Sequence, residues 1–117
     1  MKIRIKGNSL RYRLTRSEVE CLALEGYIED TTDFGPTQLT YALQSTVSGN
    51  LWACFESNTI TLFMPDWMVT EWATTDRVGF ENKEDGLFIL IEKDFVCLDN
   101  TLEDQSDNYP NPLFLKC

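Results

Sequence analysis

Apolar and charged positions alternate over the first fourteen residues, which predicts two short strands joined by a turn. Isoleucines alternate with basic residues over 2–6, and leucines and a tyrosine alternate with arginines over 10–14. A period of two puts the apolar side chains on one face of a strand and the charged side chains on the other. The segment Gly7-Asn8-Ser9 has the composition of a turn. We therefore expect a strand, a turn and a second extended segment, with a basic outer face.

The next segment carries the signals that begin and end a helix. Thr15 and Glu18 have the spacing of a capping box, in which each side chain accepts a hydrogen bond from the other's backbone N–H. Gly26 is suited to the position just after a helix, where the backbone turns left-handed. A helix over 16–25 is therefore expected. Residues 27–34 are β-branched and acidic, which argues against a helix-turn-helix unit.

The rest of the chain alternates strand patterns with one more helix pattern. The expected strands are residues 27–33, 37–47, 51–56, 59–64, 77–81 and 87–98. A turn at Ser57-Asn58 separates strands 51–56 and 59–64, and a turn at the segment NKEDG over 82–86 separates strands 77–81 and 87–98. Pro65 suits the first position of a helix, and the segment PDWMVTEWATTD that it opens has an apolar face.

These elements predict a single domain of the α+β class, over residues 1–117. The run LFILI at 87–91 is apolar on both faces, which is typical of a strand in the middle of a sheet. We expect a mainly antiparallel sheet of about six to eight strands in meander-like order, with two short helices packed on it. The pattern shows no internal repeat. Residues 100–117 are expected to form an extended, loosely packed tail.

Basic residues are concentrated at the start of an otherwise acidic chain. The 117 residues have a formal net charge of −9, yet residues 1–16 carry +6 and residues 17–117 carry −15. A mostly negative surface repels nucleic acids and anionic membranes, and no apolar run approaches the ~20 residues of a membrane span. The first residues also lack the apolar block of a signal peptide. We expect a cytoplasmic protein that binds neither membranes nor nucleic acids.

The sequence offers little support for catalysis or for a cofactor. It contains no histidine, and therefore no Cys–His or Ser–His pair. It also lacks the motifs G-x-x-x-x-G-K-[ST] and G-x-G-x-x-G, which bind phosphate groups. Four widely spaced cysteines are expected to be reduced thiols rather than disulfides or metal ligands. They are Cys21, Cys54, Cys97 and Cys117.

The main candidate site is the basic face of the N-terminal segments. Its residues are Lys2, Arg4, Lys6, Arg11 and Arg13. Arginines on such a face can hold a phosphate or a carboxylate through two parallel hydrogen bonds. The same cations can instead pair with the protein's own carboxylates or protect an edge strand from aggregation. Because the chain has nineteen acidic residues, internal pairing is the interpretation that we favour.

A secondary candidate site is the charged triplet Glu92, Lys93 and Asp94, which follows an apolar strand. Alternation puts Glu92 and Asp94 on one face and Lys93 on the other. A Lys93 that faces the interior would need a carboxylate partner and could have a lowered pKa, as catalytic lysines do. We favour the other interpretation, in which the strand leaves the core and its charges reach solvent.

The segment MPDWMVTEW concentrates two methionines and two tryptophans. These residue types are enriched at protein interfaces, and they are equally suited to a helix that covers a sheet. Core packing is the interpretation that we favour.

Several segments together resemble a family of small bacterial proteins of unknown function. They are KIRIKGNSLRYRLTRSEVE at the start, DFG at 33–35, MPDWMVTEWATTDRVGF, and LIEKDFVCLD followed by NYPNP. The resemblance spans nearly the whole chain. It implies a small single-domain intracellular protein of bacterial origin, and it assigns no activity and no role to any residue.

The expected function is a non-catalytic binding or accessory module. Its basic N-terminal face would engage an acidic protein segment or a phosphate-bearing small molecule. One alternative is an enzyme acting on a phosphorylated or carboxylated metabolite, with Arg4, Arg11 and Arg13 binding the anion and Glu92 or Asp94 as acid or base. Another is a homo-oligomer in which the basic strand of one copy meets the acidic surface of another.

Overall fold

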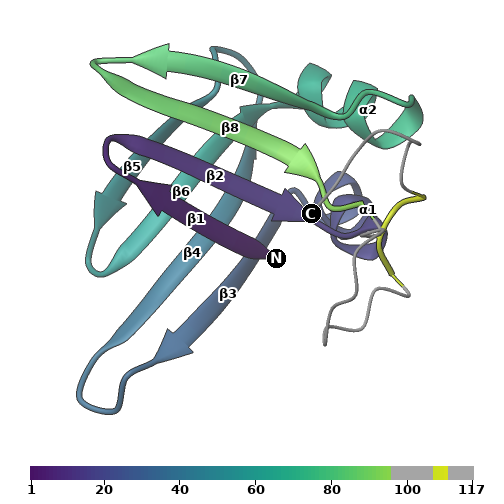
Figure 1. Cartoon of the computed structure of the whole chain (residues 1–117). Helices are drawn as coiled ribbons and strands as arrows, with labels where there is room; N and C mark the ends of the chain where they lie inside the picture. The colour runs from purple at the N-terminus through teal and green to yellow at the C-terminus, as the bar shows by residue number, and fades with distance from the viewer. Residues whose placement is uncertain (96–106, 111–117) are drawn as a thin grey trace.

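Two four-stranded sheets and two helices make up the part of the chain that the computed structural model describes, residues 1–95 and 107–110 (Figure 1). In chain order the elements are β1 (Lys2–Lys6), β2 (Ser9–Leu14), α1 (Arg16–Glu25), β3 (Tyr27–Asp33), β4 (Gln38–Thr46), β5 (Trp52–Glu56), β6 (Thr59–Pro65), α2 (Asp66–Thr74), β7 (Gly79–Glu84) and β8 (Leu87–Lys93).

The strands are divided between two mixed sheets. Sheet A has the order β1-β2-β8-β7, and sheet B has the order β3-β4-β6-β5. In each sheet the central pair is parallel and the two outer pairs are antiparallel. The predicted α+β class is confirmed, with eight strands and two short helices. The expectation of one sheet in meander-like order is wrong, because β8 returns beside β2 and β6 lies beside β4.

The order of the elements is repeated, although the sequence pattern suggested no repeat. Each half of the chain contains a hairpin, a helix and a second hairpin. The first hairpin of one half and the second hairpin of the other half build each sheet. Few side chains match between the halves: Asn8 and Asn58 occupy equivalent turn positions, and Val19 and Val69 are each the fourth residue of a helix. The repeat is therefore one of topology.

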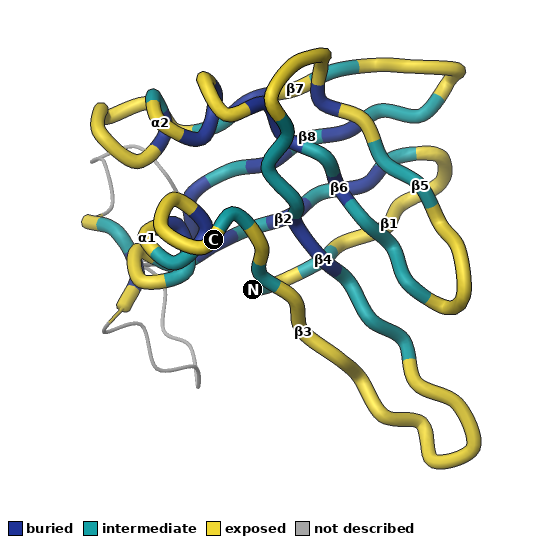
Figure 2. The backbone as a smooth tube through the Cα atoms, turned by 180° about the vertical axis from the view of Figure 1, so that it is seen from behind, coloured by how far each residue is buried: buried dark blue, intermediate teal, exposed yellow. Residues whose placement is uncertain are grey.

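The sheets lie face to face, and their strands cross at a steep angle (Figure 1). Buried residues concentrate where the sheets cross (Figure 2), and Leu43, Leu62 and Ile91 are completely buried there. Tyr12 of sheet A links the layers by donating a 3.0 Å hydrogen bond to the carbonyl of Ile60 in sheet B. The two helices were expected to lie on a sheet. Instead they contact each other and lie together at one end of the sandwich.

The predicted first helix is confirmed residue by residue. Glu18 accepts a 2.9 Å hydrogen bond from the backbone N–H of Thr15, and the capping box is complete. Gly26 has a φ of 75° and donates its N–H to the carbonyl of Leu22, which ends the helix. Val19 and Leu22 are its buried residues. Local spacing therefore decides both ends of α1.

Two strand boundaries and the C-terminal segment differ from the prediction. β7 runs from Gly79 to Glu84, because its turn to β8 needs only Asp85 and Gly86, both with positive φ. β8 ends at Lys93, and the predicted continuation over 96–98 lies outside the described residues. Most of the predicted tail also lies outside them. Within 107–110, Tyr109 forms an isolated parallel bridge with Phe95.

The tryptophans of α2 have different environments. Trp72 is completely buried, and its indole N–H donates a 2.9 Å hydrogen bond to the carbonyl of Val78. Met64 and Met68 are also buried, so core packing is confirmed for these three residues. Trp67 is 57% exposed and does not belong to the core.

Cys21 and Cys54 are half-buried free thiols, whereas Cys97 and Cys117 lie outside the described residues. In the described part of the chain, no group of three or more potential ligands could hold a metal ion. No helix in the same part is both long enough and apolar enough to cross a membrane.

Candidate functional site

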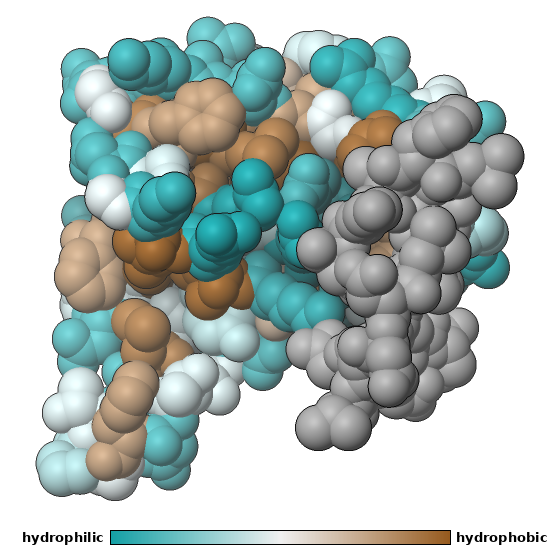
Figure 3. All heavy atoms as spheres, viewed as in Figure 1, coloured by the Kyte–Doolittle hydropathy of each residue, from teal (hydrophilic) through white to brown (hydrophobic). Residues whose placement is uncertain are grey.

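The predicted basic residues lie on one face of sheet A. In the β1–β2 hairpin, Lys2 is opposite Arg13, Arg4 is opposite Arg11, and Lys6 is opposite Ser9. Since side chains alternate along a strand, these five cations share the outer face, while the alternate residues point toward sheet B. Figure 3 shows hydrophilic side chains beside apolar ones on this face of the molecule.

Four of the five cations line a hollow of about 180 Å³. The lining residues are Lys2, Ile3, Arg4, Arg11 and Arg13. Lys6 lies on the same face, but it does not line the hollow. The hollow brings three guanidinium groups and one ammonium group around a single space, which is of a size suited to a small anionic group.

Internal ion pairs occupy part of this basic face. Glu92 of β8 lies 2.8 Å from Nε of Arg13 and 3.7 Å from Nε of Arg11. Lys2 lies 2.9 Å from Oδ2 of Asp94. Within residues 1–95 and 107–110, Arg4 and Lys6 form no ion pair. The favoured interpretation of internal pairing therefore holds for Lys2, Arg11 and Arg13, and it does not hold for the other two.

The register leaves like charges opposite each other. Lys2 faces Arg13, and Arg4 faces Arg11, at directly opposite positions of antiparallel strands. Like charges at such positions destabilise the pairing by a few tenths of a kcal/mol to about 1 kcal/mol. Glu92 offsets the charges of Arg11 and Arg13 from the β8 side, but it does not reach Arg4. An anion held between Arg4 and Arg11 would relieve the remaining repulsion.

The triplet 92–94 is arranged differently from the favoured expectation. Lys93 and Asp94 are only 5% and 4% exposed, so the expectation that their charges reach solvent is wrong. Lys93 points into the molecule, where its Nζ donates a 2.8 Å hydrogen bond to the carbonyl of Thr75 and lies 4.8 Å from the centre of the Tyr109 ring. Burial lowers the pKa of Lys93, and the carboxylate of Asp76 partly opposes this effect. Lys93 therefore lies in the interior, but its hydrogen-bond partner is a backbone carbonyl and not the carboxylate that this alternative required.

The lowered pKa of Lys93 predicts a pH dependence of stability. Between its folded-state pKa and its ordinary value, the folded protein binds fewer protons at Lys93 than the unfolded chain does. Lys93 therefore makes the free energy of unfolding rise with pH over this interval, by up to about 1.4 kcal/mol for each pH unit. Below the interval, Lys93→Met removes the cost of burying the ammonium group.

The measurement is urea unfolding of the wild type and Lys93→Met from neutral pH to pH ~10. We expect any stability advantage of the variant to shrink as the pH rises. The tyrosines are the same in both proteins, so their titration cancels in the comparison. A stability difference that stays constant over this range would contradict the prediction.

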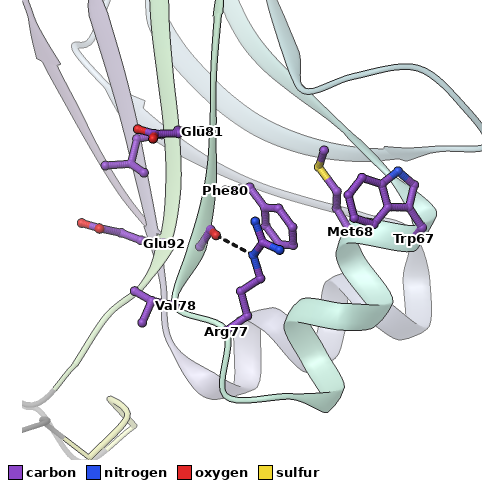
Figure 4. Close-up of a pocket in the computed structure, with 9 residues that line it drawn as sticks. Trp67, Met68, Arg77, Val78, Phe80, Glu81 and Glu92 are labelled. Atoms are coloured by element: carbon purple, nitrogen blue, oxygen red, sulfur yellow. Dashed lines mark hydrogen bonds between the residues drawn. The ribbon is translucent and has the colours of Figure 1, made fainter.

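A second hollow, which the sequence did not indicate, lies beside α2 and β7 (Figure 4). It has a volume of about 430 Å³, and Trp67, Arg77 and Phe80 are among its lining residues. The guanidinium carbon of Arg77 lies 3.9 Å from the centre of the Phe80 ring, and Arg77 also bonds the carbonyl of Gly79 and the carboxylate of Glu71. Arg77 is therefore already paired within the chain.

The acidic residues of this second hollow do not face its aromatic residues. Figure 4 shows Glu81 and Glu92 on one side of the sheet, and Trp67, Met68 and Phe80 on the other. Among the described residues that line this hollow, neither carboxylate is aimed at the space beside Trp67. This hollow therefore lacks the convergent polar groups that are typical of a binding or catalytic site.

The carboxylates proposed as acid or base are both engaged. Glu92 lies beside the basic hollow, as an enzyme with Glu92 as acid or base would require. However, the guanidinium groups of Arg11 and Arg13 already bind its carboxylate. Asp94 is buried and paired with Lys2. In the described part of the chain, no thiol or lysine amine lines the hollow other than Lys2. The arrangement can bind an anion.

Comparison with known proteins places the chain in a family whose function is not known. The model of the family of unknown function DUF7009 matches residues 1–113, and the chain belongs to this family. No curated protein and no solved structure gives a significant match. The resemblance noted in the sequence is thus confirmed at the level of the family, and no residue receives a role from it.

Proposed function

For this member of a family of unknown function, we propose a non-catalytic binding module that holds an anionic group in the basic hollow of sheet A. The single observation that carries the proposal is the position of Arg4 directly opposite Arg11 on paired strands, with both side chains lining the hollow. Arg4 has no ion-pair partner among residues 1–95 and 107–110. A carboxylate or a phosphate oxygen would accept charge-assisted hydrogen bonds from both guanidinium groups.

The surrounding charges support an acidic ligand that is bound at a defined place. Residues 17–117 carry a net charge of −15, and a net negative charge of this size repels anions, which favours the basic face as the place where an anion binds. Glu92 holds the Arg11 and Arg13 side chains in position from one side. The free thiols of Cys21 and Cys54 support a reducing, cytoplasmic location.

The test is the binding of inorganic phosphate, and of a glutamate-rich peptide, measured by calorimetry at low salt. We expect Arg4→Gln/Arg11→Gln to lower the affinity for these probes at least tenfold, because it removes two of the three guanidinium groups that line the hollow. Binding by the wild type should weaken as salt is added, since screening shortens the range of the interaction.

The matched control is Lys83→Gln. Lys83 is exposed, lies in β7 opposite Phe88, and shares the outer face of sheet A at its other edge. Its loss changes the net charge without changing the hollow, and we expect the affinity to stay within a factor of two or so of the wild type. Equal binding by the wild type and Arg4→Gln/Arg11→Gln would overturn the proposal.

A further inference from the structure

We propose that the acidic edge strand β3 of a second copy of this chain is a partner of the basic edge strand β1, so that two copies form a closed pair. This inference rests on the proposed function, because it names a source for the carboxylates that the basic face would bind. It is carried by three features: two free sheet edges, their opposite charges, and their position on one side of the molecule.

β1 and β3 are both edge strands. Among the strands of residues 1–95, β1 has β2 as its only neighbour in sheet A, and β3 has β4 as its only neighbour in sheet B. An edge strand presents unpaired N–H and C=O groups that can pair with another strand. β3 is exposed along most of its length, and Figure 2 shows it as a largely exposed arm. Each copy can therefore donate one edge and accept another.

The two edges carry opposite charges at alternating positions, although on β3 the neutral Thr31 separates the two carboxylates. Lys2, Arg4 and Lys6 alternate along the outer face of β1. Glu29, Thr31 and Asp33 alternate along the outer face of β3. Opposite charges at facing positions of paired strands are favourable, whereas like charges are unfavourable.

These charges also exclude two alternative pairings. A β1–β1 contact would place cations opposite cations, and a β3–β3 contact would place carboxylates opposite carboxylates. Only the mixed contact is complementary, which favours one arrangement over the others. Within residues 1–95 and 107–110, no ion pair involves Arg4, Lys6, Glu29 or Asp33.

The position of the edges suits a closed pair. The amino group of Met1, just before β1, lies 3.8 Å from Oδ2 of Asp30 in β3. The start of β1 therefore lies beside the middle of β3, and one copy can present both edges to the same partner. A two-fold arrangement then makes the β1–β3 contact twice, which closes the assembly and prevents a filament.

Apolar residues next to both edges support a covered surface. Ile5 of β1 is 60% exposed, and Phe34, directly after β3, is 66% exposed. A second copy seated on these edges would remove apolar area from water around each of them. Burial of such side chains is favourable, at roughly 25 cal/mol for each Å².

The experiment measures the mass of the full chain by analytical ultracentrifugation at about 0.01 M and about 1 M salt. We expect a dimer at low salt that dissociates at high salt. The variant Arg4→Glu/Lys6→Glu makes both edges acidic, and Glu29→Lys/Asp33→Lys makes both edges basic. Each variant alone should be monomeric, with a dimer dissociation constant raised at least tenfold. An equimolar mixture of the two should form a heterodimer, because each acidic edge then meets a basic one.

The control is Glu20→Lys/Glu25→Lys, which makes the same change in net charge on the exposed surface of α1. It should dimerise as the wild type does. Circular dichroism establishes that every variant is folded. A monomeric wild type at low salt, reversed variants that still dimerise, or a mixture of folded variants that stays monomeric would each overturn the inference.

The outcome also separates this inference from the proposed function. A monomeric wild type that binds phosphate through Arg4 and Arg11 overturns the dimer and supports the binding module. A dimer that passes the charge-reversal test, in a protein whose phosphate and peptide affinities do not depend on Arg4 and Arg11, supports the dimer and overturns the binding module.

Discussion

Trp72→Ala is expected to lower the free energy of unfolding by about 4 kcal/mol, within the range measured for the loss of large buried side chains. Trp72 is completely buried in α2. Its removal leaves a cavity and abolishes the hydrogen bond from the indole N–H to the carbonyl of Val78. Lys93 also donates its backbone N–H to this carbonyl, so the acceptor keeps one partner. Most of the loss should therefore come from the cavity, and urea unfolding followed by circular dichroism measures it.

The same helix provides a control of the same residue type. Trp67 is exposed, and its nearest aromatic partner is Phe80, at a ring distance of 5.9 Å. We expect Trp67→Ala to cost less than about 1 kcal/mol, as is usual for a surface position. Trp72→Phe removes the hydrogen bond of the indole but keeps an aromatic ring, and it should cost on the order of 1–2 kcal/mol. Similar losses for Trp67→Ala and Trp72→Ala would contradict the assignment of Trp72 to the core.

The elements that could be predicted are those whose signals lie close together in the sequence. Thr15, Glu18 and Gly26 determine both ends of α1, because the bonds that they make are within one turn. The turn at Ser57-Asn58 could be located because both residues accept a positive φ in a two-residue hairpin.

The arrangement of the strands could not be predicted from the same signals. The neighbour of β2 is β8, which comes from the other end of the domain, and the two strands are parallel. Alternation in β2 indicates which side chains are buried, but it does not indicate which strand lies beside them. The apolar run in β8 correctly predicted a central strand, which lies between β2 and β7.

The candidate site shows the same division. The shared face of Arg4, Arg11 and Arg13 follows from alternation and from a short turn, which sets the register of the hairpin. The pairing of Arg13 with Glu92 depends on the position of β8, so it required the structure. The burial of Lys93 was not indicated because its partner is the backbone carbonyl of Thr75, an acceptor that every residue has.

Gly79→Ala is expected to lower the free energy of unfolding by about 3 kcal/mol, at the upper end of the usual cost of overpacking. A Cβ at Gly79 would lie 2.0 Å from the carbonyl oxygen of Ile91 and 2.9 Å from Cα of Glu92. Both contacts are with backbone atoms of β8, which cannot rotate away as a side chain can. β7 must therefore separate from β8 at the start of their pairing, where Gly79 is opposite Glu92.

The control Gly49→Ala distinguishes this close approach from the conformational freedom of glycine. Gly49 has a φ of 99°, and a Cβ there would meet no atom within 4 Å. Its replacement strains only the backbone and should cost about 1 kcal/mol.

Urea unfolding of both variants measures the difference, and hydrogen exchange of the β7 and β8 amides should be faster in Gly79→Ala alone. Equal losses of stability would mean that contact with β8 is not the reason for glycine at position 79. A larger loss for Gly79→Ala would connect this position to the basic face, because Gly79 lies against the backbone of Glu92, whose carboxylate binds Arg11 and Arg13.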